Sequence, residues 1–171
     1  MENYNKESVT LFFVDIYGTI DGKFSDDDLQ VFAKLLKKLK EENESNYLFF
    51  DLLSTENLMV VDYYEHALSK YFSDGVKIVE RPLDAEVTRE TKVAYALYYI
   101  ERLKKQYDID AVYYADDSAM LHKIFSDILL YKEGLELHSI IPKKEENNLN
   151  FINNEIEERF TNGNSKYLSK W

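Results

Sequence analysis

The segment from Leu11 to Ile20 places a short apolar run directly before an acidic residue and a glycine. The run, Leu11 to Val14, is rich in aromatic and β-branched side chains and is typical of a buried strand. Gly18 then allows a tight change of direction. A carboxylate at the carboxyl end of a central strand is where α/β folds place their chemistry, so Asp15 is a candidate functional residue. The same pattern also fits a strand followed by a polar turn that contains Asp15.

Strand-length apolar runs and longer segments with helical spacing alternate along most of the chain. Strand patterns occupy residues 11–14, 47–53, 76–79, 111–114 and 135–141, and helical patterns occupy residues 26–42, 56–71, 92–107, 120–132 and 151–160. This alternation is typical of an α/β fold with a parallel sheet. We assign residues 1–145 to this domain and residues 146–171 to a C-terminal helix and tail that pack on it or trail from it.

Three consecutive acids, Asp26 to Asp28, stand at the start of the first expected helix. Such a group resembles a metal-binding cluster. However, Ser25 can cap this helix, and acidic side chains are favourable at its positive end. We therefore interpret the three acids as a helix start.

The composition excludes several classes of function. The net charge of −11 argues against binding to nucleic-acid phosphates, which needs a basic surface. The lack of cysteine excludes disulfides and thiolate chemistry. The sequence has no leader pattern and no apolar stretch near the ~20 residues that a membrane span needs. We expect a soluble, cytoplasmic protein with no nucleic-acid or membrane partner.

Polar residues also follow two later strands, and a lysine begins a later helix. Ser54 and Thr55 follow the strand over 47–53, and Asp116 and Asp117 follow the strand over 111–114. Both pairs could simply cap the next helix. Lys92 is unfavourable at a helix N-terminus, so a bound anion explains its position better than helix stability does.

The string Asp15-Ile16-Tyr17-Gly18-Thr19 resembles the first signature of the haloacid dehalogenase superfamily, in the form found in its dehalogenase branch. The resemblance implies that Asp15 is a nucleophile that forms a covalent aspartyl intermediate and that Thr19 supplies a site hydroxyl. Phosphatases of this superfamily usually carry a second Asp two residues after the nucleophile, whereas this chain has Tyr17 there.

The later polar residues resemble the other three signatures, in the same order. The resemblance implies that Ser54, with Thr55 in reserve, and Lys92 hold phosphoryl oxygens. It also implies a Mg²⁺ ion held by Asp15, the Tyr17 carbonyl and Asp116. The further acid that the family often carries is replaced by alanine and methionine at positions 119 and 120, and Asp117 could substitute for it.

The resemblance further implies a three-layer, Rossmann-like fold with a five-stranded parallel sheet in the order 5-4-1-2-3. The segments between the signatures are too short for the cap domain that usually covers the site in this family. We expect an open site, or one covered by the loop over 80–88 or by a second subunit. The 14 Tyr and 10 Phe residues offer material for a homo-oligomer interface.

Three functions follow as hypotheses. The first is a Mg²⁺-dependent phosphohydrolase acting on a small phosphorylated molecule such as a nucleotide. It would be slow or limited to good leaving groups, because Tyr17 replaces a general acid worth about 10² to 10⁴ in rate. The second is a nearly inactive protein that sequesters a nucleotide-like ligand at the same site. The third is dehalogenase-like attack on carbon without metal, against which the missing cap counts.

Overall fold

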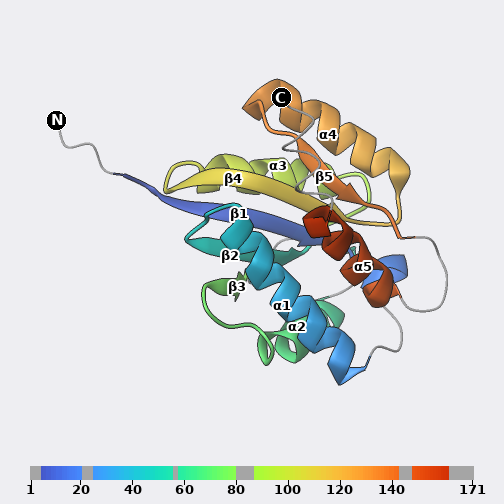
Figure 1. Cartoon of the computed structure of the whole chain (residues 1–171). Helices are drawn as coiled ribbons and strands as arrows, with labels where there is room; N and C mark the ends of the chain where they lie inside the picture. The colour runs from blue at the N-terminus through green and yellow to red at the C-terminus, as the bar shows by residue number, and fades with distance from the viewer. Residues whose placement is uncertain (1–4, 21–24, 56–57, 80–86, 143–147, 162–171) are drawn as a thin grey trace.

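The computed structural model describes residues 5–20, 25–55, 58–79, 87–142 and 148–161 and shows an α/β fold (Figure 1). In chain order the elements are β1 (Glu7–Val14), the π-helical turn η1 (Ile16–Ile20), α1 (Asp26–Glu42), β2 (Tyr47–Leu52), α2 (Leu58–Ser69), β3 (Val76–Ile78), α3 (Lys92–Leu103), β4 (Tyr107–Ala115), α4 (Ala119–Glu133), β5 (Leu137–Ile140) and α5 (Asn148–Thr161). Strands and helices therefore alternate as the sequence predicts.

The five strands form one parallel sheet in the order β3-β2-β1-β4-β5, which confirms the predicted order. β1 lies at the centre, where Phe12 pairs with Phe50 of β2 and with Tyr113 of β4. Their rings stack across the three strands, with centroids 6.2 and 5.7 Å from that of Phe12. Because all strands run the same way, their carboxyl ends meet at a single edge of the sheet.

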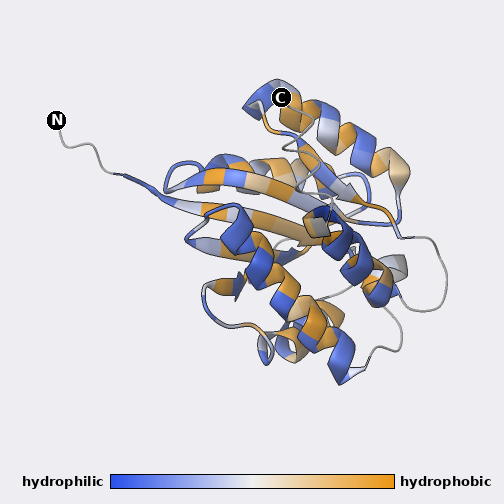
Figure 2. Ribbon diagram, viewed as in Figure 1, coloured by the Kyte–Doolittle hydropathy of each residue, from blue (hydrophilic) through white to orange (hydrophobic). Residues whose placement is uncertain are grey.

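Helices cover both faces of the sheet, with α1, α2 and α5 on one side and α3 and α4 on the other (Figure 1). Successive residues of β1 point to opposite faces, so that Phe12 and Val14 join the first side and Leu11 and Phe13 join the second. A strand buried on both faces needs a continuous apolar run. Figure 2 shows apolar residues along β1 after its hydrophilic start, whereas β4 and the helices mix apolar and polar residues.

Helix α1 has the predicted bounds, and its buried face consists of apolar residues at helical spacing, Leu29, Phe32, Leu35, Leu36 and Leu39. Ser25 Oγ accepts a hydrogen bond from the Asp28 backbone N–H at 3.2 Å, and the Asp28 carboxylate accepts one from the Ser25 N–H at 3.2 Å. This reciprocal cap confirms that the three acids mark a helix start.

Several predicted boundaries were wrong where strand pairing extends an element. β1 begins at Glu7 rather than Leu11, and β4 begins at Tyr107 rather than Ala111, because the two strands pair along their whole length. Helix α3 consequently ends at Leu103 instead of continuing to Tyr107. The polar–apolar alternation of residues 107–110 was the overlooked strand signal.

Some predictions lie outside the described residues. They are the turn that Asp21-Gly22 indicates, most of the loop expected at 80–88, most of the polar linker that residues 143–150 indicate, and the tail after residue 161. None of the described helices combines the length and apolar character that a membrane crossing requires.

Candidate functional site

Backbone hydrogen bonds hold together the strand ends that carry the candidate residues. The Asp15 N–H donates to the Ala115 carbonyl at 2.9 Å, and the Leu53 N–H donates to the Val14 carbonyl at 2.8 Å. These bonds continue the sheet ladder for one residue beyond β1 and β2. They fix Asp15 just past the end of the central strand, with both neighbouring strands beside it.

Lys92, the first residue of α3, joins two of the predicted site residues. Its Nζ lies 2.9 Å from Asp15 Oδ1 and 3.0 Å from Asp116 Oδ2. All three residues are buried, with 4%, 5% and 1% of Lys92, Asp15 and Asp116 exposed. We predicted that a bound anion explains a lysine at this helix start. In the structure, two carboxylates of the chain itself supply the negative charge that pairs with it.

The electrostatics of Asp15 are unusual for a carboxyl group. Burial raises its pKa to about 7, and the nearby Asp116 adds to the rise, although Lys92 opposes it. One ammonium shared between two carboxylates does not fully compensate both. Thr19 Oγ1 lies 3.5 Å from Asp15 Oδ2, so the second carboxylate oxygen also has a neighbouring donor.

Asp116 has partners that sequence reasoning missed. Its Oδ2 accepts a hydrogen bond from the Tyr114 hydroxyl, and its Oδ1 accepts one from the Ser118 backbone N–H at 2.9 Å. The His122 Nε2–H donates to the Asp116 backbone carbonyl at 2.8 Å. Burial alone would raise the pKa of Asp116, but Lys92, Tyr114 and Ser118 together lower it.

Two signals in the sequence could have found these partners. Tyr114 stands two residues before Asp116, and alternate residues of an extended chain face the same way. The second signal is that His122 stands in the first turn of the helix that follows Asp116, where it is buried with its ring centroid 4.4 Å from that of Tyr114.

The carboxylates of Asp15, Asp116 and Asp117 form a group that could hold a metal ion. One oxygen from each lies within 4.8 Å of the others, and Asp117 is only partly buried. Carboxylate oxygens are the hard ligands that Mg²⁺ and Ca²⁺ prefer, so the donor set fits a divalent cation of this class. The prediction of a metal site is supported to this extent, and the choice of Mg²⁺ stays a prediction.

The remaining predicted residues lie near the same sheet edge. Ser54 follows β2 and is buried, whereas Thr55 is exposed, which makes Ser54 the better placed hydroxyl. The backbone of Tyr17 belongs to η1, and its side chain lies outside what the structure describes. The expected tight turn at Gly18 is therefore a π-helical turn, a feature that is frequent at functional sites.

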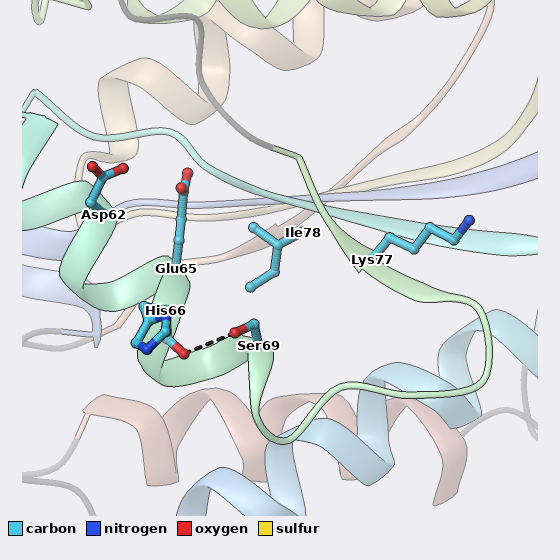
Figure 3. A pocket seen from close by; sticks show the side chains of 6 residues that line it. All are labelled: Asp62, Glu65, His66, Ser69, Lys77 and Ile78. Atoms are coloured by element: carbon cyan, nitrogen blue, oxygen red, sulfur yellow. Dashed lines mark hydrogen bonds between the residues drawn. The ribbon is translucent and has the colours of Figure 1, made fainter.

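A separate hollow of about 710 Å³ lies between α2 and β3 (Figure 3). It is lined by Asp62, Glu65, His66, Ser69, Lys77 and Ile78. Lys77 extends away from the two acids, and the hydrogen bond in this view joins Ser69 Oγ to the His66 carbonyl at 2.8 Å. The lining contains none of the predicted site residues.

The concentration of buried charge makes the Asp15–Lys92–Asp116 cluster a stronger candidate site than this hollow.

Comparison with protein-family models, curated proteins and solved structures gives no match for this chain.

Proposed function

We propose that the protein is a metal-dependent phosphohydrolase that acts on a small phosphorylated molecule through an aspartyl intermediate. The observation that carries this proposal is the buried cluster in which Lys92 lies between Asp15 and Asp116 at the carboxyl edge of a parallel sheet. Burying two carboxylates around one ammonium costs stability, and a functional role explains why the chain keeps them there. Ligands of open α/β folds bind at this edge.

In this proposal an oxygen of Asp15 attacks the phosphorus atom. A phosphorus–oxygen bond forms to Asp15, and the bond to the leaving group breaks. Water then hydrolyses the aspartyl phosphate and releases inorganic phosphate. A divalent cation held by Asp15, Asp116 and Asp117 would favour ionised Asp15 and neutralise phosphoryl charge.

Protein groups supply the remaining charge stabilisation. The Lys92 ammonium adjoins Asp15, so it can move towards a phosphoryl oxygen as negative charge develops there. The buried Ser54 is the proposed second donor. Tyr17 occupies the position of the missing general acid, so the favoured substrates have leaving groups that depart without a proton, such as the phosphoanhydrides of nucleotides.

The proposal is tested by measuring phosphate release from a panel of nucleotides and sugar phosphates, with Mg²⁺ or with EDTA. We expect Mg²⁺-dependent release by the wild type and none by Asp15→Asn. Asp127→Asn is the matched control, because Asp127 is an exposed carboxylate paired only with exposed Lys123 among the described residues. Release that survives in Asp15→Asn or in EDTA would contradict the proposal.

A second candidate is a binding protein with little or no turnover. It is favoured by the state of Asp15, whose two oxygens face Lys92 and Thr19 and whose raised pKa reduces the ionised fraction. Ligand recovered intact after denaturation, with no phosphate released, would support this candidate. Chloride release from a haloacid without metal would instead support dehalogenase-like attack on carbon.

A further inference from the structure

The Tyr114 hydroxyl donates a hydrogen bond to the same carboxylate oxygen of Asp116 that Lys92 contacts. Tyr114 is fully buried, and its hydroxyl donates to Oδ2, which lies 3.0 Å from Lys92 Nζ. A carboxylate has about four acceptor sites, two on each oxygen. Both sites on Oδ2 are therefore taken. In the described part of the chain, Oδ1 accepts a single hydrogen bond, from the Ser118 N–H.

The main chain of Asp116 is held as firmly as its side chain. Its N–H donates to the Ile140 carbonyl at 3.2 Å, and its carbonyl accepts from His122 Nε2 at 2.8 Å. The Tyr114 ring packs on His122 and lies 5.4 Å from the Phe125 ring, centroid to centroid. The Tyr114 hydroxyl therefore has a fixed position from which to orient the carboxylate.

We propose that Tyr114 is a positioning residue that makes Asp116 a one-oxygen ligand, presenting only Oδ1 to a divalent cation. This inference rests on the proposed function in one respect, which is that the site binds such a cation. Mg²⁺ requires near-octahedral geometry with carboxylates that each offer one oxygen, whereas Ca²⁺ accepts bidentate carboxylates and six to eight ligands. Blocking Oδ2 therefore favours Mg²⁺ over Ca²⁺.

The test is to titrate wild type and Tyr114→Phe with MgCl₂ and with CaCl₂ in a calorimeter. The substitution deletes a single oxygen atom and keeps the ring. Loss of a partner that orients a metal ligand typically costs 10- to 100-fold in affinity. We expect a fall of this size for Mg²⁺ and a smaller fall for Ca²⁺, because the released Oδ2 can then join Oδ1 on the larger ion.

The matched control is Tyr113→Phe. Tyr113 is the preceding residue of β4 and is also buried, but it packs on the opposite face of the sheet, where its hydroxyl lies 3.3 Å from Asn43 Nδ2. We expect this variant to keep both wild-type affinities. Circular dichroism of each variant establishes that it is folded before titration.

The ratio of the two affinities separates positioning from general loosening of the site. An unchanged Mg²⁺/Ca²⁺ ratio in Tyr114→Phe, whether both affinities fall equally or neither falls, overturns the inference and leaves the proposed function standing. Wild-type protein that binds neither ion overturns the inference together with the metal dependence of the proposed function.

Discussion

Replacing Lys92 by methionine would remove the ammonium that lies between the carboxylates of Asp15 and Asp116. Methionine has a similar length and fills the space without charge. The protein should remain folded in metal-free buffer at pH 8 but lose much of its stability. The loss arises because the two buried carboxylates would lose their shared partner, and Asp15, whose pKa Lys92 holds down, would have to take up a proton to escape repulsion by Asp116.

The magnitude follows from the geometry of the cluster. Lys92 Nζ lies 2.9 Å from Asp15 Oδ1 and 3.0 Å from Asp116 Oδ2, so each attraction that the substitution removes is about 5.5 kcal/mol at an effective dielectric constant of about 20, and protonation of Asp15 recovers part of the sum. Removing one partner of a buried ion pair costs about 3–5 kcal/mol in measured cases. For a domain of this size, that loss corresponds to a fall in Tm of roughly 6–20 °C.

The assay is urea unfolding followed by circular dichroism, in EDTA at pH 8. Lys123→Met is the control, because Lys123 pairs with Asp127 on the exposed surface of α4, where an ion pair contributes at most about 1 kcal/mol. The double variant Lys92→Met/Asp15→Asn should recover at least half of the loss, since only one carboxylate then lacks a partner.

Two results would refute this reasoning. One is a loss below about 1 kcal/mol for Lys92→Met, which would mean that water or another group compensates the carboxylates. The other is an equal cost of Lys92→Met in the wild-type and Asp15→Asn backgrounds. Additivity of that kind would show that Lys92 and Asp15 do not interact.

Three further results are expected. In urea unfolding at pH 8 in EDTA, Asp15→Asn should stabilise the protein by at most about 4 kcal/mol. The folded state raises the pKa of Asp15 from 3.8 to about 7, so wild-type stability falls as pH rises through that window, and the amide avoids this loss. A destabilised variant would contradict this reasoning. Tyr17→Asp should speed Mg²⁺-dependent phosphate release from an aryl phosphate by restoring a proton donor, and no gain would count against the phosphohydrolase. Light scattering should give the mass of a homo-oligomer, whose interface would use exposed aromatic side chains such as Tyr63 and Tyr131; a monomer mass at micromolar concentration would exclude it.

Local sequence patterns determined the order of helices and strands along the chain and the edge of the sheet that carries the candidate site. The run before Asp15 is apolar at every position, which indicates a strand buried on both faces. The bounds of α1 were predictable from Ser25 and the spacing of its apolar residues, because a cap and a helical period are encoded within a few residues.

Element lengths that depend on a partner strand were decided by the tertiary structure. The polar–apolar alternation of residues 107–110 is a strand signal, but it is too short to fix where helix α3 ends, and pairing with β1 makes residues 107–115 a strand. The register shift between Val9 and Thr10 is a property of two strands together. No local signal specifies such pairing, because it depends on residues about 100 positions apart.

The site divides in the same way. Its candidate residues Asp15, Lys92 and Asp116 could be predicted, since each stands at the end of a strand or the start of a helix. Their hydrogen bonds could not be predicted, because they depend on side-chain conformation and on the packing of α3 and α4 against the sheet. That packing alone decided that Lys92 pairs with both carboxylates. It also decided that Tyr114 bonds the side chain of Asp116 and that His122 bonds its backbone carbonyl.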